Sequence, residues 1–164
     1  MPDFPKPGIV FYDITTLFLE PAALRTAIDS LAEYGRSQGI DYVVSAEARG
    51  FVLGGALAAA CDAGFILARK PGKLPRPTTS VEYQLEYGID ALEVHDDAIR
   101  GGARVLVHDD LLATGGTAVA LCELVEEAGG VVAGCAFVIE LSSLRGRERL
   151  SDYDVYSLLA YESE

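Results

Sequence analysis

Hydrophobic residues recur along the chain at the spacing of amphipathic helices. After Pro21, which suits a first helical position, Leu24, Ile28 and Leu31 recur at helical intervals up to a stop near Gly39. Two further segments predict helices, namely the small-residue stretch GFVLGGALAAACDAG and the segment from Gly116 to Ala128.

Short apolar runs between these helices predict buried β-strands. They are YVVSA, FILAR, RVLVH, VVAGCAFVIE and VYSLLAY, in chain order. Because strands that alternate with helices form right-handed βαβ units, we expect an α/β fold with a mostly parallel twisted sheet and helices on both faces. Since the sequence contains no internal repeat or linker, residues 1–164 are expected to form a single domain.

A different pattern interrupts this alternation at about residues 78–96. In SVEYQLEYG the apolar residues fall at every second position, a turn follows at GID, and ALEVH continues. This period of two predicts a half-exposed antiparallel hairpin inserted into the parallel fold. A hairpin of this kind fits a plain edge of the sheet, which the pattern alone slightly favours, or an arm over a binding site.

The charge balance restricts the choice of partner. A formal net charge of −12 argues against nucleic acid and anionic membranes, both of which require a cationic surface. The exception is a basic loop with Arg69, Lys70, Lys73 and Arg76, because no acidic residue occurs between positions 63 and 81. The loop is compatible with a small anionic ligand and equally with a solvated surface.

Cysteine usage and the N-terminal sequence point to the cytoplasm. Cys61, Cys122 and Cys135 are widely spaced in apolar runs, as expected for buried reduced thiols. The start MPDFPKPG lacks the features of a secretory signal, and no stretch is apolar enough to span a bilayer. We therefore expect a cytoplasmic protein.

The stretch VLVHDDLLATGGTAV carries the clearest candidate chemistry. Asp109 and Asp110 are expected at the carboxyl end of a strand, where open parallel sheets bind ligands. The small residues that follow expose backbone N–H groups at a helix start, which favours a phosphate. They are Ala113, Thr114, Gly115, Gly116 and Thr117.

Two acids beside a phosphate turn suit a phosphorylated sugar, with hydroxyls on the carboxylates and phosphate on the turn. The turn lacks the Lys of GxxxxGK[ST], and the chain has no GxGxxG, so neither a P-loop nor a dinucleotide site is indicated. A surface turn with a capping role would explain one Asp and one Gly, but it would not explain the whole stretch.

The strand, the acid pair and LLATGGT resemble the phosphoribosyl-diphosphate motif of the type I phosphoribosyltransferases. PKPGIVFYDIT, EARGF, RKPGKLP, YQLEYGIDALEVHDDAI and LSSLRGRERL are similar, in order and spacing, to segments of the adenine phosphoribosyltransferases. The resemblance covers nearly the whole chain, and RKPGKLP and LEYG are specific to the adenine branch. It implies transfer of a 5-phosphoribosyl group from phosphoribosyl diphosphate (PRPP) to N9 of adenine, with Mg²⁺, giving AMP and pyrophosphate.

The resemblance also implies residue roles. The turn would bind the 5-phosphate, Asp109 and Asp110 would bind the ribose hydroxyls, and Mg²⁺ would be held mainly by PRPP and water. Pyrophosphate would meet four cations, partly across a homodimer interface: Arg49, Arg69, Lys70 and Lys73.

The hairpin would be the catalytic hood of the family. Glu86, with Tyr87 beside it, would exchange a proton with the purine, and Val10 and Phe11 would contact adenine. Without the resemblance, Glu86 is equally a solvated strand residue and Phe11 equally a core residue.

Two residues depart from the family pattern. Tyr12 stands where a basic residue is common, and His108 replaces an apolar residue before the acids. Alternative functions are a phosphoribosyltransferase for another purine, which LEYG and RKPGKLP disfavour, and a non-catalytic PRPP-sensing regulator. A regulator would be expected to lose Glu86 or to add a DNA-binding segment.

Overall fold

The computed structural model describes residues 13–84 and 89–162. Its main sheet contains five strands, all parallel, in the order β2-β1-β5-β6-β7. The strands are β1 (Tyr42–Ala46), β2 (Gly64–Ala68), β5 (Arg104–Leu112), β6 (Val131–Leu141) and β7 (Val155–Tyr161). The predicted α/β fold with a mostly parallel sheet is confirmed.

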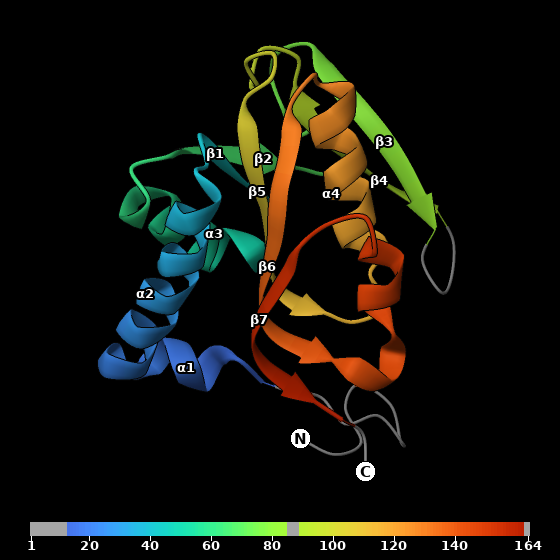
Figure 1. Ribbon diagram of the computed structural model, residues 1–164. Coiled ribbons are helices and arrows are strands. Elements are labelled where there is room, and N and C mark those ends of the chain that lie inside the picture. Colours follow the sequence, from blue (N-terminus) through green and yellow to red (C-terminus); the bar gives the residue numbers. More distant parts are fainter. Residues whose placement is uncertain (1–12, 85–88, 163–164) are drawn as a thin grey trace.

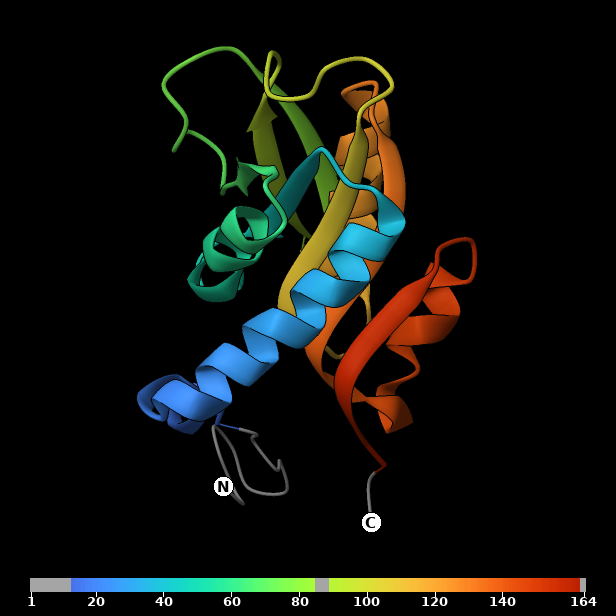
Figure 2. The ribbon, with the colours of Figure 1, turned by 60° about the vertical axis from the view of Figure 1, so that its left-hand side comes forward.

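Helices cover both faces of this sheet, as predicted (Figures 1 and 2). On one face α2 (Pro21–Gln38) and α3 (Gly50–Ala60) bury Leu31, Leu53 and Leu57 against Val43 and Leu106 of the central strands. A short α1 (Thr15–Leu19) precedes α2. On the other face α4 (Gly116–Glu127) packs its Leu121, Leu124 and Val125 on Val105 and Val107. None of the helices among the described residues is long and apolar enough to cross a membrane.

The predicted hairpin forms a separate two-stranded antiparallel sheet. Its strands are β3 (Thr78–Gln84) and β4 (Ile89–His95), with Val81 opposite Leu92. Val81, Leu92 and Val94 are buried in the core on the α4 side, while Glu82 is exposed. The period of two is therefore confirmed as far as Gln84, and all four residues of LEYG (85–88) lie outside the described residues.

The predicted end of the third strand of the main sheet was wrong. We expected Asp109 and Asp110 just after it, but β5 continues to Leu112. It continues because Asp109, Leu111 and Leu112 remain paired with β6, whereas pairing with β1 stops at Ser45 and His108. The acids therefore lie where β1, rather than β5, leaves the sheet.

The order of the strands creates a switch point between β1 and β5. The chain passes from β1 through α3 outward to β2, and later from β5 through α4 to β6 in the opposite direction. At such a point the segments that follow two neighbouring strands diverge, and they leave a crevice at the carboxyl ends. The site described below occupies this crevice.

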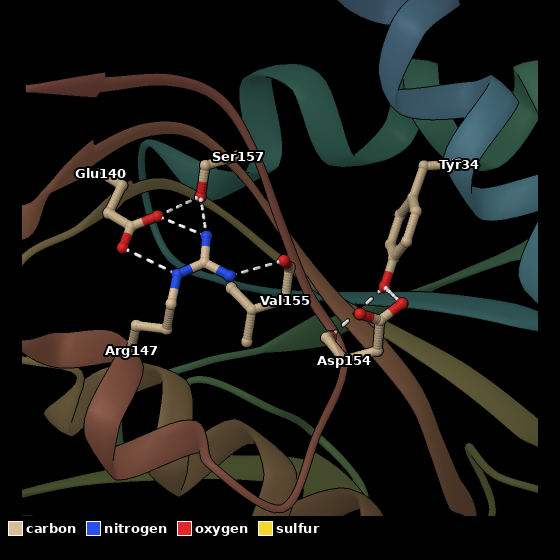
Figure 3. A network of polar contacts seen from close by, with 6 residues as sticks. All are labelled: Tyr34, Glu140, Arg147, Asp154, Val155 and Ser157. Atoms are coloured by element: carbon tan, nitrogen blue, oxygen red, sulfur yellow. Dashed lines mark hydrogen bonds and ion pairs between the residues drawn. The ribbon is translucent and has the colours of Figure 1, made fainter.

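Two short 3₁₀ helices, η1 (Ser142–Leu144) and η2 (Gly146–Leu150), connect β6 to β7. An ion pair anchors this segment: Arg147 donates from Nε and Nη2 to the buried Glu140 carboxylate at 2.9 and 2.5 Å (Figure 3). Nη1 of Arg147 also donates to the Val155 carbonyl, and Ser157 donates to Glu140. These hydrogen bonds, that of Arg147 before that of Ser157, lower the pKa of Glu140 below its usual value.

Candidate functional site

A cavity of about 210 Å³ lies at the switch point between β1 and β5. Its lining combines the loop after β1, the acid pair on β5, the hairpin and the start of α4. The lining residues are Ala46, Glu47, Ala48, Arg49, Lys70, Tyr83, Leu92, Asp109, Asp110 and Thr117. Five of the residues predicted from sequence thus line one cavity: Arg49, Lys70, Asp109, Asp110 and Thr117.

The two neighbouring acids differ in their surroundings. Asp110 is 5% exposed and forms an ion pair with Arg49, whose Nε lies 3.1 Å from Oδ2. Asp109 is partly exposed, and its Oδ1 accepts the backbone N–H of Asp110 at 2.9 Å. Partial removal of its carboxylate from water, followed by the nearby charge of Asp110, raises the pKa of Asp109 above its usual value. A ligand with hydroxyl groups would reduce the repulsion between the two carboxylates, because hydroxyls donate hydrogen bonds to carboxylates.

Glu47 organises the loop that follows β1. Its carboxylate accepts the backbone N–H of Lys70 at 2.6 Å and the Nε and Nη2 groups of Arg69 at 3.1 and 3.0 Å. These contacts, that of Lys70 first, lower the pKa of Glu47. The peptide bond between Glu47 and Ala48 is cis. Glu47 therefore ties the loop after β1 to the basic loop after β2.

The hairpin contributes a second anchor for the basic loop. Asp90 on β4 pairs with the Lys70 ammonium group and accepts the hydroxyl of Tyr83 at 3.2 Å. Arg69 exchanges two backbone hydrogen bonds with Glu93, at 2.8 and 2.9 Å. The hairpin is thus fixed along the basic loop and closes one side of the cavity.

The predicted phosphate turn adjoins the main cavity. A smaller hollow of about 80 Å³ is lined by residues 111–118, and Thr117 lines both cavities. Gly115 has a φ of +83°, a left-handed conformation that favours glycine, and Gly116 begins α4. The turn is held from behind by Gly146, because a Cβ on Gly146 would lie only 2.3 Å from the Ala113 carbonyl oxygen.

His108 is buried directly before the acid pair. Its Nδ1 lies 2.9 Å from the Ala136 carbonyl oxygen, and it pairs in register with Ser45 of β1. Burial lowers its pKa to about 4, so the ring is neutral at physiological pH. The structure thus places this departure from the family pattern inside the core.

The remaining predicted residues fall into two groups. Arg69 and Lys73 belong to the adjoining loop but do not line the cavity. Val10, Phe11, Glu86 and Tyr87 fall outside the described residues.

The structure also adds three polar residues that we had not singled out from the sequence. They are Glu47, Tyr83 and Asp90, which line or support the cavity. Glu47 stands in EARGF and Asp90 in GID, so the motifs contained both residues, but their pairing with Arg69 and Lys70 depends on the tertiary fold.

Taken together, the crevice combines groups of three kinds. Carboxylates can accept hydroxyl donors, backbone amides at the start of α4 can bind phosphate, and cations near β1 and β2 can bind a second anion. This arrangement fits a sugar that carries anionic groups at both ends.

Comparison with known proteins agrees with this chemistry. Residues 14–162 match the family model described as phosphoribosyl transferase domain. A protein of Koribacter versatilis, named adenine phosphoribosyltransferase, is 60% identical over 162 residues, which are 99% of this chain and 89% of that protein. The chain belongs to the adenine phosphoribosyltransferase family. By this membership it is a pentosyltransferase, and the resemblance inferred from the motifs is confirmed.

Solved structures of the adenine phosphoribosyltransferase family share the fold. The enzyme from Thermoanaerobacter pseudethanolicus superposes with a TM-score of 0.94 at 48% identity, over 98% of this chain and 94% of that chain. The enzyme from Saccharomyces cerevisiae has a TM-score of 0.92 at 39% identity, over 97% and 92% of the two chains. That structure is a complex with adenine and D-2,5-dideoxy-2,5-imino-altritol 1,6-bisphosphate.

Proposed function

We propose that this adenine phosphoribosyltransferase joins the 5-phosphoribosyl group of PRPP to N9 of adenine, producing AMP and pyrophosphate in purine salvage. The observation that carries this proposal is the placement of the acid pair between a phosphate turn and a group of cations in one crevice. The yeast relative, which binds adenine together with a bisphosphate, supports the choice of substrates.

The crevice suggests how PRPP lies in it. The 5-phosphate occupies the turn from Ala113 to Thr117, and the ribose hydroxyls donate to Asp109 and Asp110. Pyrophosphate lies toward Arg49 and Lys70, with Arg69 and Lys73 contributing from the adjoining loop. Because pyrophosphate gains negative charge as it leaves, fixed cations at this end lower the barrier.

Arg49 and Lys70 are each paired with a carboxylate, Arg49 with Asp110 and Lys70 with Asp90. We infer that the donor competes for them. Its ribose hydroxyls take over Asp110, which releases Arg49 toward the pyrophosphate. The cations then form ion pairs with the ligand in place of the protein carboxylates.

Mg²⁺ fits this donor because hard oxygen ligands are available from pyrophosphate, ribose and water. Among the described residues, no three His, Cys, Asp or Glu side chains gather into a metal-binding group. We therefore propose that PRPP and water supply most ligands, with Asp109 and Asp110 as the protein carboxylates nearby. The bound ion would neutralise charge on the leaving pyrophosphate.

The adenine and proton-transfer roles are assigned to residues outside the described part of the chain. Val10 and Phe11 are proposed to contact the base, since an aromatic ring stacks well on a purine. Glu86 is proposed to exchange a proton with adenine, with Tyr87 beside it. The hairpin reaches the phosphate turn at Gln84, whose carbonyl oxygen would lie 3.3 Å from a Cβ on Gly116, and this supports the assignment.

We also propose that the protein works as a homodimer in the cytoplasm. The edge strand β2 exposes Leu67 beside the basic loop, and α3 exposes Val52. A cavity of about 440 Å³ along this edge is lined in part by Phe65, Leu67 and Leu74. An apolar edge of this kind fits a second copy of the chain, which would also bring another basic loop close to the site.

One kinetic experiment tests the proposed function. With Mg²⁺ and PRPP, the protein is expected to make AMP from adenine, with little product from hypoxanthine, guanine, xanthine or orotate. Asp109→Asn should raise KM for PRPP about tenfold without changing KM for adenine, because an amide nitrogen, which only donates, replaces one carboxyl oxygen that accepts from a ribose hydroxyl. Asp29→Asn, at an exposed position on α2, is the matched control. Absence of AMP would refute the proposed function, and an unaltered KM for PRPP in Asp109→Asn would refute the ribose assignment.

A further inference from the structure

Arg149, within the LSSLRGRERL motif, places a cation beside the phosphate turn. Its Nη1 donates to the Thr114 carbonyl at 3.5 Å and would lie 3.6 Å from a Cβ on Gly116. These two residues belong to the turn and to the first position of α4. The side chain is exposed, so its remaining N–H groups are open to a ligand.

The two cations that line the main cavity, and the two other arginines of the 3₁₀ segment, are paired with carboxylates. Arg49 pairs with Asp110 and Lys70 with Asp90, while in the 3₁₀ segment Arg145 pairs with Glu148 and Arg147 with Glu140. Arg149 forms no ion pair with any carboxylate in residues 13–84 and 89–162. In a chain with a net charge of −12, an arginine next to an anion-binding turn but without an acidic partner is informative.

The backbone that carries Arg149 is fixed on both sides. Gly146 packs against the Ala113 carbonyl, and Leu150 is fully buried on the α4 side of the sheet. The bidentate ion pair of Arg147 with Glu140 holds the same segment to β6 (Figure 3). Because the segment is anchored, the guanidinium loses little backbone freedom when it binds an anion.

We propose that Arg149 is a further ligand of the 5-phosphate, in both PRPP and AMP. A phosphate monoester carries nearly two negative charges, and the guanidinium fork matches its oxygens. The backbone amides at the start of α4 hold one side of the phosphate, and Arg149 adds a full charge on the other. This inference rests on the proposed placement of the 5-phosphate at residues 113–117.

Calorimetric titration of the full chain tests the proposal with three probes: AMP, ribose 5-phosphate and pyrophosphate. Loss of one charge-assisted contact at a partly solvated position should weaken binding about tenfold. Arg149→Gln should show this loss for AMP and ribose 5-phosphate but not for pyrophosphate. Arg149→Lys, which keeps the charge without the fork, should fall between Arg149→Gln and the wild type. In kinetics, Arg149→Gln should raise KM for PRPP and leave KM for adenine unchanged.

The control is Arg25→Gln, which removes one positive charge from an exposed position on α2. It should bind all three probes as the wild type does. Unchanged binding of AMP and ribose 5-phosphate by Arg149→Gln would overturn the proposal, as would an equal loss for pyrophosphate, which indicates a general charge effect.

Thr117→Val separates this inference from the proposed function, because Thr117 belongs to the turn itself. If Thr117→Val weakens AMP binding and Arg149→Gln does not, the placement of the 5-phosphate stands and the proposed role of Arg149 is wrong. If neither variant weakens AMP binding, the placement of the 5-phosphate and the proposed role of Arg149 are both wrong.

Discussion

At the scale of single residues, His108 places an ionisable ring in the core next to the acid pair. Its side chain is fully buried, and its Nε2, like the Oγ of its neighbour Ser45, has no hydrogen-bond partner among the described residues. Burial lowers the pKa of His108 from 6.5 to about 4, although the hydrogen bond to Ala136 opposes the shift. An unfolded chain therefore binds a proton at this residue more readily than the folded protein does.

This difference predicts a stability change with pH. The stabilising contribution of neutral His108 is complete above pH 6.5 and is lost as the pH falls toward 4. Between pH 7.5 and pH 5 the loss amounts to roughly 2 kcal/mol of unfolding free energy. The raised pKa of Asp109 has the opposite effect on stability, since the free energy of unfolding that Asp109 contributes is lost as the pH rises.

Urea unfolding at pH 7.5 and pH 5 measures the contribution of His108. The wild type should lose more stability on acidification than His108→Leu, by roughly 2 kcal/mol. His95→Gln, which replaces the other histidine of the chain, should behave as the wild type does. Equal pH dependence in the wild type and His108→Leu would contradict the assignment.

At the scale of elements, the phosphate turn and the 3₁₀ segment interlock through two glycines. A Cβ on Gly146 would lie 2.3 Å from the Ala113 carbonyl oxygen and 3.0 Å from the Gly115 nitrogen. Both are backbone atoms, so the turn would have to move to accept even one methyl group. The position of the turn therefore depends on a segment that contributes no residue to the lining of either cavity.

Gly146→Ala should consequently affect both stability and donor binding. Overpacking at a buried contact costs about 1–3 kcal/mol of unfolding free energy. Because the turn is displaced, KM for PRPP should also rise about tenfold or more, while KM for adenine stays near the wild-type value. Gly101→Ala is the control, since a Cβ there meets no atom of residues 13–84 and 89–162 within 4 Å. Indistinguishable behaviour of the two variants in urea unfolding and in kinetics would disprove the interlock.

The elements that followed from local patterns were predicted well. The strand at Tyr42–Ala46 and the helix starting at Gly116 match the structure, because burial on both sides and a glycine turn leave clear signals. The helix from Gly50 ends earlier than predicted, at Ala60, since the chain turns at Asp62 with a φ of +54°. The end of β5 was missed because its last residues are held by pairing with β6, which no local pattern reveals.

The candidate site was also predicted only in part, because sequence patterns reveal neighbours along the chain and not tertiary contacts. Motif residues such as Asp109 and Thr117 could be assigned because their chemistry is adjacent in sequence. The partners of the cations could not, because Asp90 meets Lys70 only after the hairpin packs along the basic loop. The LSSLRGRERL segment has no periodicity, so its position behind the turn emerged only from the fold.

At the scale of the whole molecule, the two edges of the sheet offer different surfaces. The β2 edge exposes Leu67, adjoins the apolar cavity and leads directly into the basic loop. The β7 edge exposes Leu159, which lies far from the basic loop in strand order. If pyrophosphate is bound partly across a dimer interface, the second copy of the chain must pack on the β2 edge, because this edge leads into the basic loop.

Sedimentation velocity distinguishes the two edges. The wild type should sediment with twice the mass of the chain, and Val52→Asp combined with Leu67→Asp should sediment as a monomer, because buried charges oppose association. Leu159→Asp, at an exposed leucine on the other edge, should remain dimeric. The monomeric variant should also show a raised KM for PRPP, since it lacks the basic loop of a second copy. A monomeric wild type, or dissociation caused by Leu159→Asp alone, would show that the β2 edge is not the interface.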